Sequence, residues 1–248
     1  MPERLYLPGG SIPWLDESPT FPPLKQALKY PNGLLAIGGD LSAARLIAAY
    51  RRGIFPWFSP GEPILWWSPD PRMVLVPDQI KISRSFAKVL RNSDYQVRLD
   101  TAFGDVISAC ANTPRAGQDG TWISAEMQQA YRHLHQLGYA HSVEVWQQGT
   151  LTGGLYGVAL GRIFFGESMF SHRSNASKIA LAHLCHFLKK RDFCVIDCQM
   201  ETAHLVSMGA AAIPRPSFAA LLDRYADVSP PTEARWPTDG VSGIFRNS

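Results

Sequence analysis

The sequence contains few cysteines, little excess charge and no long apolar run. Its four cysteines include one C-x3-C pair, Cys194 and Cys198, with no second pair to complete a metal site. We interpret them as small buried side chains in a reducing compartment, with half of a metal site as the alternative. No apolar run approaches the roughly 20 residues of a membrane helix, and residues 1–4 lack the pattern of a signal peptide. These absences favour a cytoplasmic protein that does not engage a membrane.

Several catalytic motifs are also missing. The sequence has no G-x-S-x-G, no H-E-x-x-H, no Walker loop and no G-x-G-x-x-G, and its seven histidines show no metal spacing with matched acids. Hydrolases, zinc peptidases and nucleotide-binding enzymes built on these motifs are therefore disfavoured. The composition, with 46% hydrophobic and 18% charged residues, is that of an ordinary globular protein.

The net charge of +3 is small, but it is unevenly distributed along the chain. Residues 72–98 hold six basic and two acidic residues, a net of +4, which leaves −1 for the rest of the chain. The six basic residues are Arg72, Lys81, Arg84, Lys88, Arg91 and Arg98. A basic strip of this kind is what a phosphate backbone requires, so it indicates a nucleic-acid partner or, alternatively, a solvated helix face.

The amino-terminal part is rich in proline and aromatic residues. Residues 1–30 lack periodicity and predict an extended, irregular arm, whereas residues 43–50 keep helical spacing after a capping Asp40 or Ser42. Residues 53–72 place three tryptophans and two phenylalanines among prolines, which predicts irregular loops. Such aromatics either fill a domain interface or stack on a base. We expect a domain boundary near Pro71, which gives a small domain of residues 1–71 and a larger one of 72–248.

The larger domain alternates helices and strands. Three closely spaced strands, residues 141–146, 150–159 and 162–170, predict an antiparallel meander. Apolar spacing predicts helices that begin after Ser83 and Ser124, another through residues 103–110, and a long helix over residues 175–190. The remaining predicted elements are strands at 95–99 and 193–200 and helices at 202–208 and 217–225. The fold class is therefore α/β, with a mixed sheet.

Two polar positions within strands are candidates for chemistry. Asp197 and Gln199 lie in an otherwise apolar strand, and a period of two places them on one face, away from Cys198. Burying them without partners is costly, so they indicate a functional pair unless the strand is a hydrated sheet edge. We expect Asp197→Ala to abolish activity with the fold intact. Glu167 is the second candidate, after Gly166, with a solvent-facing side chain as the alternative.

Seven segments, taken together, resemble the bacterial leucyl/phenylalanyl-tRNA–protein transferases. They lie in the same order as in that family and span the chain from about Pro31 to Pro214. The segments are PNGLLAIGGDLS (31–42), RGIFPWFS (52–59), LWWSPDPR (65–72), GTWI (120–123), HSVEVW (141–146), FGESMFS (165–171) and IDCQ (196–199).

This resemblance implies a small amino-terminal domain followed by a GNAT-like acyltransferase domain. It implies an enzyme that moves Leu, Phe or, less well, Met from aminoacyl-tRNA to the α-amino group of proteins beginning with Arg or Lys, which marks them for degradation. It also implies no metal and no coenzyme A, and we expect the enzyme to be a monomer. The sequence lacks the R/Q-x-x-G-x-G/A loop that holds pyrophosphate in acetyl-CoA users.

The resemblance also assigns roles to residues. Asp197 and Gln199 would act at the reacting amine, and Trp57 and Trp122 would bind the adenosine of the donor. The aminoacyl side chain would enter a pocket formed by Leu155, Phe164, Met169, Leu181, Leu184, Leu188 and Ile196. We further expect Glu167 to bind the acceptor side chain, and the tRNA backbone to contact Arg72, Lys81, Arg84, Lys88 and Arg91.

One conflict within this assignment predicts a local feature. Phe164 and Met169 have opposite parity on a regular strand, so both reach one pocket only if the strand is kinked. Gly166, which lies between them, is the position where we expect a bulge.

Three other classes of protein remain as alternatives. A Fem-type aminoacyl-tRNA transferase would share the fold and donor but usually carries tandem domains. An acetyltransferase would need the missing phosphate loop. A noncatalytic tRNA-binding module would explain the basic strip but would leave Asp197 and Gln199 without a role.

Overall fold

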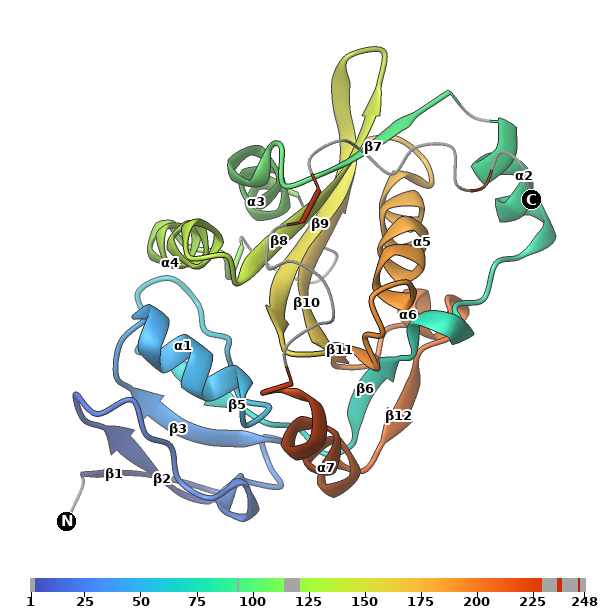
Figure 1. Cartoon of the computed structure of the whole chain (residues 1–248). Coiled ribbons are helices and arrows are strands. Elements are labelled where there is room, and N and C mark those ends of the chain that lie inside the picture. Colours follow the sequence, from blue (N-terminus) through green and yellow to red (C-terminus); the bar gives the residue numbers. More distant parts are fainter. Residues whose placement is uncertain (1–2, 93, 114–120, 229–235, 238–244, 246–248) are drawn as a thin grey trace.

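The computed structural model describes residues 3–92, 94–113, 121–228, 236–237 and 245. Within these residues the strands form two sheets, the smaller from residues 4–67 and the larger from residues 72–213. Figure 1 places the small sheet and its helix α1 (Ala43–Tyr50) at one end of the molecule, beside the lower ends of the long strands of the large sheet. The predicted α/β class with a mixed sheet is confirmed.

The small sheet has the strand order β1-β2-β3-β5-β4. Its strands are β1 (Arg4–Leu7), β2 (Gly10–Leu15), β3 (Leu34–Gly38), β4 (Phe55–Pro56) and β5 (Leu65–Trp67), and the 3-10 turn η1 (Leu24–Gln26) precedes β3. The prediction of an irregular arm over residues 1–30 is wrong, because β1 and β2 form an antiparallel hairpin and β2 pairs with β3. The hairpin is stabilised by fully buried Ile12, which packs with Leu28 and Leu34. The expectation of irregular loops over residues 53–72 is also wrong in part, because β4 and β5 pair there.

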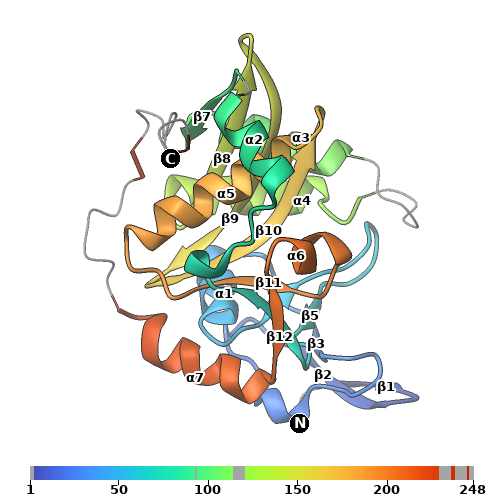
Figure 2. The ribbon, with the colours of Figure 1, turned by 90° about the vertical axis from the view of Figure 1, so that its right-hand side faces the viewer.

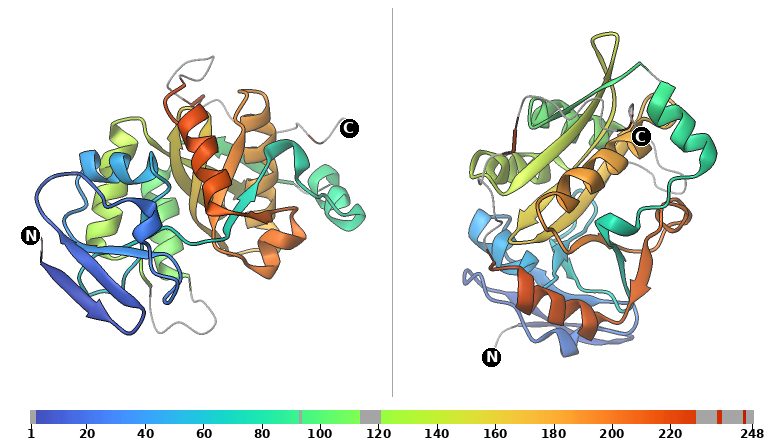
Figure 3. Two further views of the ribbon diagram at one scale, coloured as in Figure 1. Left: turned by 90° about the horizontal axis from the view of Figure 1, so that it is seen from below. Right: turned by 45° about the vertical axis from the view of Figure 1, so that its right-hand side comes forward.

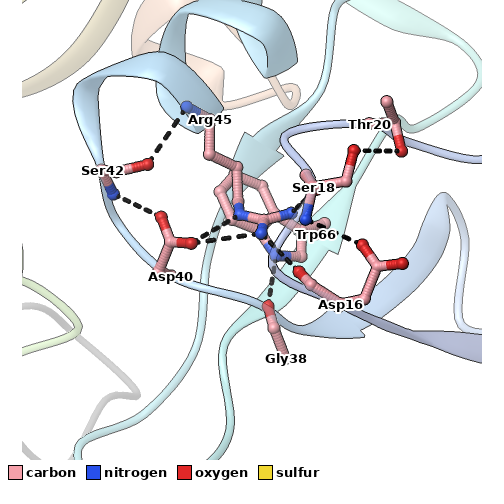
Figure 4. Close-up of polar contacts among 8 residues, drawn as sticks. All are labelled: Asp16, Ser18, Thr20, Gly38, Asp40, Ser42, Arg45 and Trp66. Carbon is pink, nitrogen blue, oxygen red and sulfur yellow. Dashed lines mark hydrogen bonds and ion pairs between the residues drawn. The ribbon is translucent and has the colours of Figure 1, made fainter.

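One buried arginine ties this hairpin to α1. Arg45 is completely buried, and its guanidinium donates to the carbonyls of Asp16 (2.6 Å) and Ser18 (2.9 Å) and to the carboxylate of Asp40 (3.1 Å). Figure 4 shows these contacts, together with Ser42, whose hydroxyl accepts from the backbone N–H of Arg45 and caps the helix. Each donor on a buried guanidinium needs an acceptor, and here the loop carbonyls supply them.

The large sheet has the order β12-β6-β11-β10-β9-β8-β7. Its strands are β6 (Arg72–Leu75), β7 (Gln96–Leu99), β8 (Ala140–Gln147), β9 (Thr150–Leu160), β10 (Ile163–Ser171), β11 (Val195–Gln199) and β12 (Ala211–Ile213). β8, β9 and β10 form the predicted antiparallel meander. β11 then pairs parallel to β10, which requires the long crossover that α5 (Ala176–Lys189) supplies.

Helices cover both faces of the large sheet. α3 (Phe103–Asn112) and α4 (Ala125–Gln136) pack on one face, and α5 packs on the other, where Figure 2 shows it crossing the strands. The turn η2 (Pro77–Gln79), α2 (Arg84–Asn92) and the short α6 (Ala203–Ser207) lie on the α5 side. Ser83 and Ser124 cap α2 and α4 as predicted. None of the helices in the described residues is long and apolar enough to cross a membrane.

The two sheets share a core. Leu35, Tyr50 and Trp66 from the small-sheet part belong to the same buried cluster as Val106 and Phe165 from the large-sheet part. α7 (Arg215–Tyr225) lies between the small sheet and strands β6 and β12, as seen from below in Figure 3. We keep the division at Pro71 as a proposal, since the sheets separate between Trp67 and Arg72.

Candidate active site

A largely apolar cavity of about 330 Å³ lies where β10 and β11 approach the small sheet. Its wall combines the loop after β4, the segment before α4, the strands β9, β10 and β11, and the helices α5 and α6. Six of the seven residues predicted for the aminoacyl side chain line it, namely Leu155, Phe164, Met169, Leu181, Leu184 and Ile196. The seventh, Leu188, is fully buried on α5 in the same core cluster and is not part of the wall.

The bulge expected at Gly166 is present in β10. The pairing register of β10 with β9 shifts between Gly166 and Ser168, so one residue has no partner across the strands. The shift reverses the alternation of side chains, and both Phe164 and Met169 reach the cavity. The parity conflict in the sequence is thereby resolved by the backbone, as predicted.

Trp57 and Trp122 line the same cavity from two different loops. Trp57 follows β4 and contacts Trp67 edge to face at 5.6 Å between ring centroids, while the indole N–H of Trp67 donates to the carbonyl of Trp57 at 2.7 Å. Trp122 lies just before α4, and its carbonyl accepts from the backbone N–H of Ser124. Both indoles are partly exposed, so each can offer a ring face to a ligand in the cavity.

Glu167 reaches the cavity from β10 and is held by two tyrosines. The hydroxyl of Tyr50 from α1 donates to one carboxylate oxygen at 2.7 Å, and that of Tyr131 from α4 donates to the other at 2.9 Å. The two hydroxyls also contact each other. The solvent-facing alternative for Glu167 is therefore wrong, since its carboxylate is fixed between two buried rings.

This environment changes the acidity of Glu167. Burial raises the pKa of its carboxyl from 4.5 to about 7, although the two tyrosine hydroxyls act in the opposite direction. Burial and the neighbouring carboxylate also raise the pKa of Tyr50 and of Tyr131, so both phenols stay protonated as donors. Glu167 can therefore change its charge near neutral pH while its position stays fixed.

Asp197 is completely buried and paired with Arg72, which is also completely buried. The guanidinium donates to the two carboxylate oxygens at 2.7 and 2.6 Å and to the carbonyl of Gly53 at 2.9 Å. It also lies against the rings of Phe55 and Phe218, at 4.9 and 4.8 Å from the ring centroids. The assignment of Arg72 to the tRNA backbone is therefore wrong, because its donors are used inside the protein.

Asp197 and Gln199 do not share a strand face as the alternation predicts. The register of β11 with β6 shifts between them, and Gln199 has a left-handed φ of 56°. Gln199 lines the cavity, whereas Asp197 does not, and the backbone N–H of Gln199 donates to the carboxylate of Asp197 at 3.0 Å. The Asp197–Arg72 pair thus fixes the turn of the backbone that directs Gln199 to the cavity.

The other four basic residues assigned to the tRNA backbone are exposed. Lys81 precedes α2, and Arg84, Lys88 and Arg91 follow one another along that helix at spacings of four and three. Phe86 and Leu90 of α2 are buried in the core, so the basic residues occupy the outer side of an amphipathic helix. We refer to Lys81, Arg84, Lys88 and Arg91 as the α2 strip.

Three contacts that shape the site were not predicted from the sequence, namely those of Tyr50 and Tyr131 with Glu167 and that of Arg72 with Asp197. The helical pattern marked Tyr50 and Tyr131 as packed residues, and no pattern indicated that their hydroxyls meet Glu167. The pairing of Arg72 with Asp197 joins residues 125 positions apart, beyond the reach of any local pattern. Among the described residues no group of His, Cys, Asp and Glu is placed to hold a metal ion, and none of the four cysteines is part of a disulfide.

Comparison with known families gives two matches. The family model described as leucyl/phenylalanyl-tRNA protein transferase matches residues 74–223, and the model for the amino-terminal domain of that family matches residues 39–70. These matches include the residues that line the cavity and the α2 strip, and Arg72 falls in the short gap between them.

Several curated relatives carry the name leucyl/phenylalanyl-tRNA–protein transferase. The protein from Aromatoleum aromaticum is 59% identical over 236 residues, covering 95% of this chain and 99% of its own. The relative from Chromobacterium violaceum is 62% identical over 211 residues, 85% of this chain and 90% of its own. The relative from Pseudomonas fluorescens is 60% identical over 226 residues, 91% of this chain and 99% of its own.

Among solved structures the likenesses are distant. A GCN5-related N-acetyltransferase from Kribbella flavida has a TM-score of 0.36 at 7% identity, over 66% of this chain and 58% of its own. The L-PGS structure from Bacillus licheniformis has a TM-score of 0.39 at 9% identity, over 78% of this chain and 73% of its own. The mixed α/β class therefore rests on the strand order described above.

Proposed function

The chain belongs to the leucyl/phenylalanyl-tRNA–protein transferase family, and from this premise we propose that it is an aminoacyltransferase that uses this cavity. It moves Leu, Phe and, less well, Met from aminoacyl-tRNA to the N-terminal α-amino group of proteins that begin with Arg or Lys. The transfer takes place in the cytoplasm, involves a monomeric enzyme and marks the acceptor for degradation. The observation that carries the proposal is one cavity that joins an apolar pocket, two tryptophans and the polar residues Glu167 and Gln199.

The donor end of the cavity fits the terminal adenosine and its amino acid. Trp57 and Trp122 supply faces on which an adenine can stack. The apolar residues between β9, β10, β11 and α5 surround the aminoacyl side chain. Because these lining residues are all apolar, the polarity of the pocket cannot separate Leu from Val or Ile, and its shape must do so. Val and Ile differ from Leu in shape because they are branched at Cβ, which makes them stiff close to the backbone. Met169, beside the bulge, narrows the mouth of the pocket.

The reaction needs little acid–base chemistry from the protein. The donor is an activated ester, and the α-amino group has a reference pKa of about 7.7–8.0, so part of it is neutral near pH 7.5. The amide oxygen of Gln199 accepts a hydrogen bond from the attacking amine and orients it toward the ester carbonyl. The amine nitrogen bonds to the ester carbonyl carbon, and the bond from that carbon to the ribose oxygen breaks. The amine loses one proton, and the ribose oxygen takes up one proton and leaves as a hydroxyl group.

Asp197 acts on this step through Gln199. Its negative charge is matched by Arg72 at 2.6 Å, so it adds little net charge at the amine. Its role is to fix the left-handed backbone at Gln199, whose N–H it accepts. In this proposal Gln199 contacts the amine, and Asp197 with Arg72 is a positioning pair.

Glu167 serves the acceptor side. Its carboxylate, held by Tyr50 and Tyr131, pairs with the guanidinium or ammonium group of the first residue of the acceptor. That partner favours the charged form of Glu167 and lowers its raised pKa on binding. The α2 strip lies outside the cavity and binds phosphates of the tRNA body.

A competition experiment tests this specificity. The enzyme is given an equimolar mixture of tRNAs charged with Leu, Phe, Met, Val and Ile, and peptides that begin with Arg, Lys, Ala or Asp. We expect products with Leu, Phe and some Met, almost entirely on the Arg and Lys peptides. Efficient transfer of Val or Ile would contradict the pocket, and equal use of the Asp peptide would contradict the role of Glu167.

A further inference from the structure

Trp236 lies beyond both family-model matches, which end at residues 70 and 223, yet it is part of the core. Its side chain is only 8% exposed and belongs to the buried cluster on the α5 side of the large sheet. Three rings surround it: His141 of β8 stacks on it at 4.2 Å with 5° between the planes, Phe187 of α5 lies at 4.6 Å, and Phe164 of β10 lies at 5.8 Å. The indole is therefore inserted between α5 and the sheet.

The ring under Trp236 is itself held in place. The Nδ1 atom of His141 lies 2.7 Å from a carboxylate oxygen of Asp100, and the other oxygen of that carboxylate accepts from the backbone N–H of Ser142 at 2.8 Å. His141 is 3% exposed and cannot easily turn away. Trp236 thus rests on a fixed flat surface rather than on a mobile side chain.

Phe164 links Trp236 to the cavity. Its ring lies over Gly157, where a Cβ atom would come within 2.6 Å of the ring, and Gly157 is the cross-strand partner of His141. The Phe164 ring therefore has Gly157 beneath it and Trp236 beside it, and the same residue lines the cavity. Because Phe164 has no polar anchor, only packing holds its ring against the cavity wall.

We propose that Trp236 is a positioning residue that sets the depth of the donor pocket by holding Phe164 in place. The inference rests on the proposed role of this cavity as the aminoacyl side-chain pocket. Without the indole, Phe164 moves toward the vacated space and the pocket deepens. A deeper pocket gains contacts with a long side chain and fits a short one less closely, so relative use of Phe over Leu increases.

The chain offers a matched control. Phe245 is another aromatic residue beyond the family match, and it contacts His183 and His186 of α5. Neither histidine lines the cavity. Phe245→Ala removes an aromatic contact to the same helix, α5, but leaves the contact between Trp236 and Phe164 in place.

The test compares kcat/KM for Phe-tRNA and Leu-tRNA, at a temperature where each variant is folded. We expect Trp236→Ala to raise the Phe to Leu ratio by about tenfold, the scale on which one methylene is discriminated in an apolar pocket. Trp236→Phe, which keeps a ring on His141, should restore most of the wild-type ratio, and Phe245→Ala should leave it unchanged. If Trp236→Ala does not fold, Trp236→Leu, which keeps an apolar but smaller side chain, provides the same comparison.

Phe164→Ala separates this inference from the proposed pocket. A changed ratio in Phe164→Ala with an unchanged ratio in the folded Trp236 variant would overturn the role of Trp236 and leave the pocket standing. An unchanged ratio in Phe164→Ala would show that the cavity does not select the aminoacyl side chain of the donor. A ratio that shifts equally in Phe245→Ala and Trp236→Ala would reduce Trp236 to a general stabilising contact and would also overturn the inference.

Discussion

Two residues in β11, Asp197 and Gln199, illustrate how much depends on single backbone positions. They are two positions apart, yet Asp197 is completely buried in its pair with Arg72, whereas Gln199 lines the cavity. The difference arises from the shift in strand register between them and from the left-handed φ at Gln199, a backbone conformation that residues other than glycine seldom adopt. Strain of this kind persists only where the surroundings impose it, and here the buried ion pair does so.

Glu167 gives a prediction about pH. Its pKa in the folded protein is raised from 4.5 to about 7, so between these values the folded state holds a proton that the unfolded chain has released. Its contribution to stability is therefore fully present below pH 4.5 and is lost as the pH rises through about 7. For transfer to an Arg peptide, we expect kcat/KM to rise with a limb near pH 7 as the carboxylate forms.

The variant Glu167→Gln isolates this limb. It should lower kcat/KM for Arg and Lys peptides and leave donor binding unchanged. Its remaining pH dependence should follow the acceptor amine, at about 7.7–8.0. The measurement is kcat/KM against pH for both proteins. A limb near pH 7 that persists in Glu167→Gln would assign the titration to another group.

At the scale of elements, the two loops that carry Trp57 and Trp122 should act on the donor alone. Each substitution to alanine should weaken binding of an aminoacyl-adenosine by about 1–3 kcal/mol, the range for loss of one stacked base, and phenylalanine should restore part of it. Equilibrium titration measures the change. Tyr6→Ala serves as the control, because Tyr6 is an exposed aromatic residue of the small sheet and is not part of the cavity wall. Equal affinity in all the variants would favour the alternative, in which the indoles only fill the interface.

Helix α2 should act on the tRNA body and not on the ester. Charge reversal at Arg84 and Lys88 should weaken binding of full-length tRNA but spare aminoacyl-adenosine. For duplex contacts, each lost phosphate contact should flatten the slope of log K against log salt by about 0.9. Reversal at Lys25 and Lys29, which are exposed in the small-sheet part, makes the same change in net charge and is the control. An unchanged slope in the α2 variant would place the tRNA path elsewhere.

These elements differ in how far the sequence could predict them. The meander was readable because alternating apolar residues and turn glycines are local signals, and the bulge at Gly166 followed from the conflict between Phe164 and Met169. The hairpin of β1 and β2 was missed because its strands are short and half exposed and gain their stability from pairing with β3. Arg72 was misassigned because its charge was visible in the sequence but its burial was not.

At the scale of the whole molecule, Arg72 connects the small-sheet part to the large sheet and to α7. Its donors reach the carbonyl of Gly53 and the carboxylate of Asp197, and it lies between the rings of Phe55 and Phe218. The structure adds a cost in stability to the expectation that Asp197→Ala leaves the fold intact, because Asp197 neutralises a buried guanidinium. Removing one partner leaves a buried charge unpaired, whereas replacing the whole pair with apolar groups is often neutral.

We expect Asp197→Ala to lower the free energy of unfolding by about 3–5 kcal/mol. Urea denaturation measures this loss. The double variant Arg72→Met with Asp197→Leu should recover most of the stability but not the transfer activity, because Gln199 loses the acceptor for its backbone N–H. Near-wild-type stability of Asp197→Ala alone would mean that water compensates the buried guanidinium and that the ion pair contributes little to the stability of the fold.

The most direct test of the account is transfer of a labelled amino acid. Radiolabelled Leu-tRNA is incubated with the wild-type protein and a peptide that begins with Arg, beside the same peptide with an acetylated amino terminus and beside the Gln199→Ala variant. We expect label on the free peptide only, and a rate lower by about 100-fold for Gln199→Ala, the scale on which a misplaced reacting group slows an enzyme. Absence of label from the free peptide, or an undiminished rate in Gln199→Ala with normal donor binding, would contradict it.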